Sequence, residues 1–238
     1  FRDERQHFVK NNDFPLDGLF AIVRFTEKEI TDFKAYTKNI VFLDSDPNPQ
    51  EYYSILPNYH LAIQLAMEHF RKNNYNQVAY AGSVHTFGHR EESALDPRFY
   101  YYRTDQINRN CFDPQLVLDC PMNAKGGYEA MTAYLKRCGS APGAMFMSSD
   151  SIAPGILMAL QEQNIRIPQD ISIITFNNTI LSEYSNPPLT SIELSLRENA
   201  KAAAFCMELL WSGDAHGKRI VVPCSLVDRG SVQFKNFE

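Results

Sequence analysis

The sequence predicts an α/β protein built from doubly wound, mostly parallel sheets flanked by helices. Short apolar runs such as residues 144–149 and 171–176 are bounded by polar turn residues, a pattern typical of buried strands. Amphipathic stretches such as 58–73 separate these runs and indicate helices. The two kinds of segment alternate along the chain, and this alternation favours a parallel sheet covered by helices.

Local signals place the individual elements. Thr26, followed three residues later by Glu29, predicts a capping box, and Gly139 and Gly213 are expected to end two helices. Asp150 is expected to be the N-cap or a first-turn acid of a helix. Strands are predicted at 19–23, 39–44, 77–82, 116–120, 144–149, 171–176 and 191–195, with the last strands inside 219–232. Helices are predicted over 1–11, 26–36, 58–73, 98–109, 127–138, 150–163 and 196–213, and a crossover loop over 85–97.

Composition limits the classes of protein to which the chain can belong. At 238 residues, with 44% hydrophobic and 21% charged residues, it matches a globular protein with room for two modest lobes. No run approaches the roughly 18 apolar residues of a membrane-spanning helix, and the charged opening shows no secretory signal. The five cysteines form no C-x-x-C pair, which argues against a disulfide framework and a zinc site and favours free thiols in a reducing cytoplasm.

The charge balance argues against nucleic-acid binding by this chain itself. The net charge is −5, and the most basic stretches, at 71–77 and 217–219, do not form a basic stripe. Because affinity for DNA depends on neutralising phosphates, the chain should bind DNA poorly.

Polar residues end two of the predicted buried strands. Asn177 follows the strand at 171–176, and Ser149 ends the strand before it. Ligands bind at the carboxyl edge of open α/β sheets, so both residues are candidate ligand contacts. An amide both donates and accepts hydrogen bonds, which suits an array of hydroxyls. The competing interpretations are an Asx turn at Asn177 and a helix cap at Ser149.

Arg98 is a further candidate, because a guanidinium presents several donors in a fixed fork that suits vicinal hydroxyls or a carboxylate. The alternative is a surface arginine that pairs with Asp96. Aromatic side chains often stack on sugar rings, although a place in the core is their more common role. The aromatic residues nearest the expected edge are Phe87, Phe99 and Phe176.

Metal binding and catalysis are not expected. Two histidines and two glutamates lie within 85–92, but Gly88 and its polar neighbours favour a loop over the helix that would align two histidines. The sequence has no Walker A, G-x-G-x-x-G, H-E-x-x-H or G-x-S-x-G motif, and nothing pairs a nucleophile with a base. We therefore expect no metal, no cofactor and no enzymatic activity.

Several ordered motifs resemble the LacI/GalR family of sugar-responsive repressors over residues 10 to 232. HFRKNNYNQVAYAGS at 69–83 is similar to a family strand-helix-strand segment, although Asn74 and Tyr75 replace the usual Gly-His. MSSDSIAPGILMAL is similar to another, with Ser149 in place of the usual Asn. PPLTSIELS and SLVDRGSV resemble the family's closing signatures.

The resemblance implies a two-lobed, periplasmic-binding-protein-like fold in which each lobe is a doubly wound sheet. One lobe would consist of residues 1–84 and 193–220, and the other of residues 85–192 and 221–238. Relative to the family pattern, the amino-terminal lobe would lack its first strand-helix-strand.

The resemblance also implies the ligand and the residues that hold it. A small sugar or glycoside would bind in the cleft between the lobes. Arg98, Asn177 and Ser149 would hydrogen-bond it, and Met122 would close the pocket where some relatives place an aromatic residue.

The implied function is the effector-sensing and dimerisation core of a cytoplasmic transcription regulator. Such a homodimer would control operator DNA through an amino-terminal headpiece that this sequence does not contain. The alternative is a free-standing, periplasmic-type sugar-binding protein that serves transport and shares the same architecture.

Overall fold

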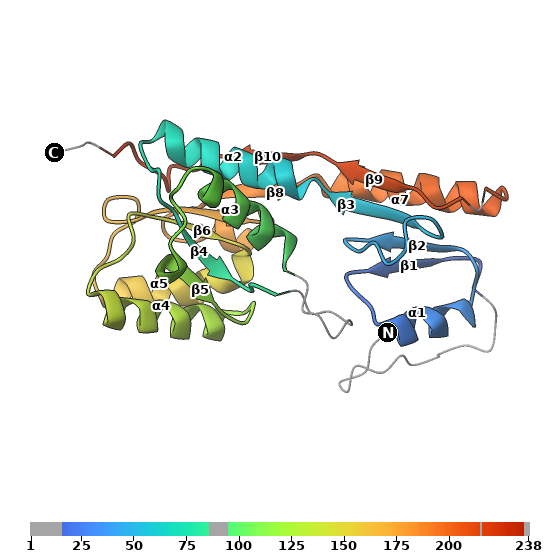
Figure 1. Cartoon of the computed structure of the whole chain (residues 1–238), viewed down its shortest axis with the longest axis horizontal. Helices are drawn as coiled ribbons and strands as arrows, with labels where there is room; N and C mark the ends of the chain where they lie inside the picture. The colour runs from blue at the N-terminus through green and yellow to red at the C-terminus, as the bar shows by residue number, and fades with distance from the viewer. Residues whose placement is uncertain (1–15, 86–94, 215, 236–238) are drawn as a thin grey trace. The chain divides into compact units, whose positions relative to one another are not determined.

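The structure, a computed structural model, describes most of the chain and divides it into two compact units (Figure 1). The described residues are 16–85, 95–214 and 216–235. Of these, the first unit contains 16–57 and 195–222, and the second contains 58–85, 95–194 and 223–235. The predicted helix at 1–11 and most of the predicted loop at 85–97 lie outside the described residues.

The division after residue 57 differs from the predicted crossing after residue 84. Helix α2 (Tyr59–Lys72) explains the difference, because its apolar face packs against elements of the second unit. These elements are helix α3 (Pro97–Asn108) and strands β8 (Thr190–Leu194) and β10 (Cys224–Val227). Periodicity predicts that a helix has a buried face, but it does not predict which sheet buries it.

The first unit is a parallel sheet with a helix on each face. Within the described residues its strand order is β1 (Leu19–Ile22), β2 (Ile40–Leu43), β3 (Tyr53–Pro57) and β9 (Arg219–Val222). Helix α1 (Glu27–Lys34) packs against Ile40 and Phe42, and helix α7 (Leu196–Trp211) packs against Val41. Because side chains alternate along a strand, the two helices cover opposite faces.

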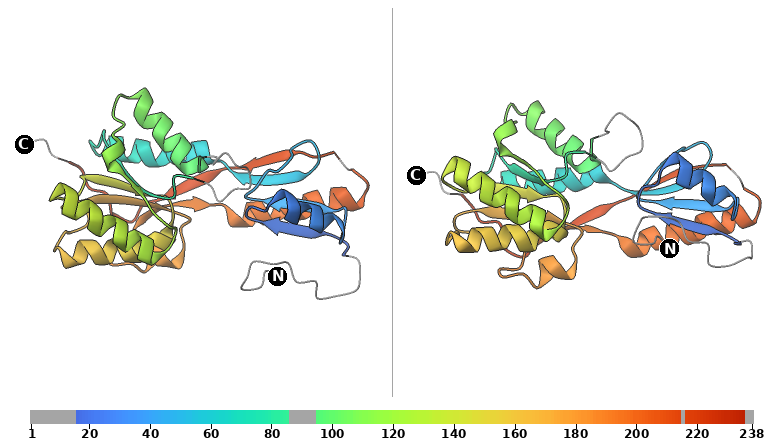
Figure 2. Two further views of the ribbon diagram at one scale, coloured as in Figure 1. Left: turned by 60° about the horizontal axis from the view of Figure 1, so that its bottom comes forward. Right: turned by 90° about the horizontal axis from the view of Figure 1, so that it is seen from below.

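The second unit is a sheet of six strands in the described residues, with helices on both faces (Figures 1 and 2). All neighbouring strands pair in parallel except β10, which pairs antiparallel with β8. Helices α2 and α3 cover one face, and α4 (Ala124–Cys138) and α5 (Ala153–Glu162) cover the other. The strand order is β10, β8, β7 (Ser172–Phe176), β6 (Ala144–Met147), β4 (Ala79–Gly82) and β5 (Val117–Asp119). The predicted doubly wound α/β class is confirmed.

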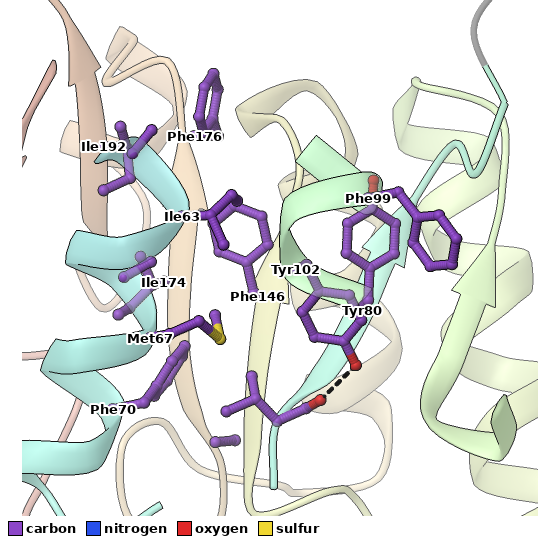
Figure 3. Packing of buried hydrophobic residues seen from close by; sticks show 14 of the residues in the cluster. Ile63, Met67, Phe70, Tyr80, Phe99, Tyr102, Phe146, Ile174, Phe176 and Ile192 are labelled. Atoms are coloured by element: carbon purple, nitrogen blue, oxygen red, sulfur yellow. Dashed lines mark hydrogen bonds between the residues drawn. The ribbon is translucent and has the colours of Figure 1, made fainter. Parts of the chain in front are cut away.

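The central strands of this sheet form the core of the second unit. Every residue of β6 and β7 is buried, as their predominantly apolar runs predict for strands covered on both faces. Figure 3 shows Phe146 and Phe176 of the sheet among Ile63 and Met67 of α2 and Phe99 of α3. On the same face, the buried Tyr102 hydroxyl donates to the Val78 carbonyl oxygen at 2.7 Å, so the α3 tyrosine is satisfied without water.

Several predicted ends are confirmed. The capping box is present: Thr26 Oγ1 accepts from the Glu29 amide at 2.9 Å, and Glu29 Oε2 accepts from the Thr26 amide at 2.8 Å. Gly139 ends α4 in the left-handed conformation, with φ of 72°. The predicted helix at 150–163 begins with a 3-10 turn, η2 (Asp150–Ile152), before α5. Strand β3 and the short helix α6 (Ile180–Glu183) are additions to the prediction.

No helix in the described parts of the chain combines the length and apolar character that crossing a membrane requires.

Candidate functional site

The strand order of the second unit changes direction at β4. The chain runs from β4 to β5 on one side and then returns to place β6 on the other side of β4. In open α/β sheets, ligands bind beyond the carboxyl ends of the strands at such a switch point. Ser83 follows β4, Ser148 and Ser149 follow β6, and Asn177 follows β7. We refer to this edge, with the side chains that reach it, as the switch-point edge.

At this edge the main chain at Gly82 lies very close to Ser148. Gly82 has a φ of 142°, which L side chains rarely adopt, and a Cβ there would lie 1.7 Å from Ser148 Oγ. Met122, from the loop after β5, lies against the same place: its Sδ accepts from the Ser83 amide at 3.3 Å and from Ser148 Oγ at 3.5 Å. The Met122 thioether therefore packs on the exits of β4 and β6.

Arg98 reaches the edge from the first turn of α3. Asp96 caps that helix by accepting from the Arg98 amide, and its carboxylate also holds the Arg98 guanidinium in a fork, with Nε–Oδ1 at 2.8 Å and Nη2–Oδ2 at 2.7 Å. Nη1 donates to the Ser148 carbonyl oxygen at 2.9 Å. The predicted alternative, pairing with Asp96, is thus present, but it leaves the guanidinium directed to the sheet edge and not to the protein surface.

Arg98 is charged, and three of its five N–H groups already have acceptors. Burial opposes the positive charge, but hydrogen bonding to Asp96 outweighs it and raises the pKa of Arg98 above its ordinary value. A guanidinium has five N–H groups, and three of them have the acceptors just described. One N–H on Nη1 and one on Nη2 have no partner among the described residues, so both can donate to a ligand.

Asn177 and Asn178 form an unusual pair after β7. Both have a positive φ, 102° and 50°, a conformation that asparagine tolerates better than most residues. Asn177 Nδ2 donates to Ser149 Oγ at 3.3 Å, so its side chain joins two strand exits where an Asx turn was the alternative. Its Oδ1 has no donor among the described residues. Arg229 Nη2 donates to Asn178 Oδ1 at 2.6 Å and holds the second amide in place.

Ser149 has the capping role that was its alternative. Its Oγ accepts from the Ser151 amide at 3.2 Å at the start of η2, and it lies 2.8 Å from Ser151 Oγ. The structure thus gathers the four predicted ligand residues at one edge through Ser148 and Ser149.

The aromatic candidates divide. Phe99 and Phe176 are core residues, 6% and 1% exposed, and Phe87 lies outside the described residues. Phe176 supports two groups at the edge: the Arg98 guanidinium carbon lies 5.6 Å from its ring centroid, and the Tyr59 ring stacks on it at 6.1 Å and 11°. The sequence prediction missed Tyr59, although an aromatic residue directly after Asn58, the N-cap of α2, was a usable signal.

Asp150 has one of its predicted places, but the sequence prediction did not anticipate its hydrogen-bond partners. It is a first-turn acid of η2, as one of the two predicted roles has it, while Ser149 is the N-cap. Its carboxylate, however, is buried and accepts hydrogen bonds from Thr175, Thr179 and Ser182.

No metal centre is evident in the described parts of the chain, which contain no group of three or more His, Cys, Asp or Glu side chains arranged to hold an ion. His85 is described and pairs with Leu95 in an isolated β-bridge, whereas the rest of the histidine-rich segment lies outside the described residues. Burial raises the pKa of the Cys120 and Cys224 thiols to about 11, so both stay protonated at neutral pH.

Comparison with known proteins identifies the family. The family model for the periplasmic binding protein-like domain matches residues 67–232. The transcriptional regulator GalR of Streptococcus thermophilus is 30% identical over 206 residues, covering 84% of this chain and 62% of the relative. GanR of Bacillus subtilis is 26% identical over 220 residues, covering 91% and 66%. The chain therefore belongs to the LacI/GalR family and contains its periplasmic-binding-protein-like domain, and it spans 62% and 66% of the length of these two relatives.

Solved structures agree with this fold. A lac repressor dimer bound to operator and the anti-inducer ONPF has a TM-score of 0.75 at 25% identity, covering 92% of this chain and 74% of that one. A complex of the transcriptional regulator CelR with cellobiose has a TM-score of 0.77 at 17% identity, covering 91% and 66%.

The Arg98–Asp96 pair yields a stability prediction. Asp96→Ala would leave the guanidinium without its bidentate partner and α3 without its N-cap, so we expect a loss of about 3 kcal/mol in the free energy of unfolding. Urea denaturation measures it. Asp170→Ala is the control, because it breaks the exposed Arg166–Asp170 pair and should leave stability close to that of the parent. Equal losses in the two variants would contradict the prediction.

Proposed function

We propose that the chain is the effector-sensing core of a LacI/GalR-type transcription regulator and binds a small neutral sugar at the switch-point edge. The observation that carries the proposal is the set of unused hydrogen-bonding groups at that edge. Two N–H groups of Arg98 and Oδ1 of Asn177 lack partners among the described residues. Arg98 hydrogen-bonds Ser148, and Asn177 hydrogen-bonds the next residue, Ser149. A hydroxyl group can accept from Arg98 and donate to Asn177 Oδ1.

The charges at the edge favour a neutral ligand. Asp96 already neutralises Arg98 through two short hydrogen bonds. The guanidinium therefore offers a ligand directed hydrogen-bond donors but little net charge. Tyr59, half-buried beside Phe176, offers an apolar surface of the kind that sugar rings pack against. The class of ligand is thus a mono- or disaccharide or a glycoside, and the CelR structure, whose title names cellobiose, is consistent with it.

The names of the relatives favour regulation over transport. GalR, GanR and the repressor MelR of Bacillus subtilis are all named as transcriptional regulators. A protein of this kind is not an enzyme and works in the cytoplasm, where its operator DNA is. DNA binding would be carried out by a headpiece outside this sequence, because a chain with a net charge of −5 can neutralise few DNA phosphates.

Self-association is the second part of the proposal. In the second unit, α5 and α6 border a hollow of about 530 Å³ with a largely apolar rim. Met158, Ile180 and Tyr184 at this rim are 55%, 71% and 79% exposed. Exposed apolar side chains that gather in one patch are typical of an interaction surface, whereas single exposed ones are not. A second copy of the chain is the proposed partner, since the lac repressor structures that share the fold are titled as dimers.

The ligand proposal predicts that Arg98→Ala weakens sugar binding by about 1.5–3 kcal/mol, because ligand hydroxyls lose a charged donor. Calorimetric titration with galactose, lactose, melibiose and cellobiose measures the loss. Arg103→Ala is the matched control, because this arginine lies on the same helix and is exposed. Unchanged affinity in Arg98→Ala would remove that residue from the site.

For DNA, we expect negligible duplex binding by this chain at physiological salt and specific operator binding by the full-length gene product. Gel-shift assays on both proteins separate the two claims. Salt-resistant binding by the chain alone would refute the first, and a full-length protein that has no DNA-binding segment would refute the second.

For self-association, Ile180→Asp with Tyr184→Asp should weaken dimerisation at least tenfold, since charges would replace apolar groups at the interface. Sedimentation equilibrium measures the dissociation constant. Tyr100→Asp on α3 is the control, because Tyr100 is 50% exposed and lies away from α5 and α6. Dimerisation that only the Tyr100 variant disturbs would move the interface to α3.

A further inference from the structure

Asp150 is a buried carboxylate with unusually complete hydrogen bonding. It is 1% exposed. Its Oδ1 accepts from Thr175 Oγ1 at 2.8 Å. Its Oδ2 accepts from the Thr179 amide at 2.5 Å, from Thr179 Oγ1 at 2.8 Å and from Ser182 Oγ at 3.0 Å. All four donors are uncharged, so the carboxylate is stabilised by directed hydrogen bonds and not by a cation.

The donors lie on both sides of the asparagine pair. Thr175 belongs to β7, before Asn177, whereas Thr179 and Ser182 follow Asn178 at the start of α6 and within it. One carboxylate, supplied by η2 after β6, therefore joins the two ends of the turn that contains the pair. Within that turn, the side-chain amide of Asn177 donates to Ser149 Oγ, and Ser149 is the residue directly before Asp150.

The turn needs such support because of its backbone. Two successive non-glycine residues have φ of 102° and 50°, and such conformations persist only where the surrounding structure determines them. The main-chain N–H of Asn177 donates to the Ile192 carbonyl oxygen, and the main-chain N–H of Asn178 donates to Ser191 Oγ. These two hydrogen bonds anchor the turn to β8. Asp150 anchors it from the other side, through β6.

We infer that Asp150 is a positioning residue of the effector site: it fixes the turn that presents Asn177 Oδ1 and does not touch the ligand. The inference deepens the proposed function and rests on it. At 1% exposure the carboxylate is out of reach of a bound sugar, so any effect of Asp150 on affinity passes through the turn. Preorganisation of this kind improves binding by removing the need to order the contact on association.

Two substitutions of similar size separate hydrogen bonding from packing. Asp150→Leu fills the space but accepts nothing. It leaves the Thr175 hydroxyl and the Thr179 hydroxyl and main-chain N–H without an acceptor, whereas Ser182 Oγ can still donate to the Thr179 carbonyl oxygen. In Asp150→Asn, the amide oxygen can take the place of Oδ2, and its NH2 can donate to Thr175, whose hydroxyl can turn to accept. We expect Asp150→Leu to bind sugar at least tenfold more weakly than the parent, and Asp150→Asn to remain within about threefold.

A double-mutant cycle with Asn177→Ala is the decisive test. The probe is whichever of galactose, lactose, melibiose and cellobiose the parent chain binds best, titrated calorimetrically. In the Asn177→Ala background, Asp150→Leu should change affinity less than about twofold, because the contact through which it acts is gone. An equal loss in both backgrounds, or parent-like binding by a folded Asp150→Leu, would overturn the inference. If Asp150→Leu does not fold, Thr175→Val with Ser182→Ala replaces it in the same cycle.

Amide hydrogen exchange supplies a readout that needs no ligand. Asp150→Leu should speed exchange at Asn177, Asn178 and Thr179 at least tenfold while leaving α3 unchanged. Unchanged exchange at these amides would overturn the inference without bearing on the sugar. Failure of the proposed function gives a different result: no sugar binds the parent, or Asn177→Ala binds as the parent does, while exchange still shows whether Asp150 holds the turn.

Discussion

The parallel alignment of β4, β6 and β7 is the constraint on which the switch-point edge depends. Parallel strands end at the same edge of the sheet, so the polar groups that follow them are brought together whatever their distance in sequence. Because these groups are buried or partly buried, most of their donors and acceptors pair with one another. Ser148 illustrates this: its carbonyl oxygen accepts from Arg98, its hydroxyl contacts Met122, and its position requires a glycine at residue 82.

Electrostatics then decides what the edge can recognise. A buried guanidinium with no counterion would be costly, and Asp96 offsets that cost with a bidentate pair while also capping the helix that carries Arg98. This pairing uses two of the five N–H donors of Arg98 and neutralises its charge, and the Ser148 carbonyl oxygen takes a third donor. In the proposed site, two N–H groups of Arg98 and Oδ1 of Asn177 remain for a ligand, and such a set would discriminate by hydrogen-bond geometry more than by charge.

Local sequence patterns predicted much of this structure, and their limits have physical reasons. The strands β6 and β7 follow from predominantly apolar runs. The spacing of three residues between Thr26 and Glu29 located the start of a helix. Strand β3 was missed because five residues between a proline-rich turn and a helix give too little periodicity to recognise. Arg98, Asn177, Ser149 and Met122 could be named from strand ends and resemblance. The stacking of Tyr59 on Phe176 and the contacts of Asp150 could not be predicted in this way, because their partners are distant in sequence.

Asp150 shows why such roles escape local analysis. As an acid in a first turn it has an adequate local explanation, and nothing nearby in sequence signals a further one. Its donors, Thr175, Thr179 and Ser182, lie 25 to 32 residues away and come within reach only when β6 and β7 pair. Arg229 reaches Asn178 over 51 residues in the same way. Contacts that the sheet creates therefore offset the conformational cost of the asparagine turn during folding. Under the proposed function, Asn177 would then not have to be ordered again when a sugar binds.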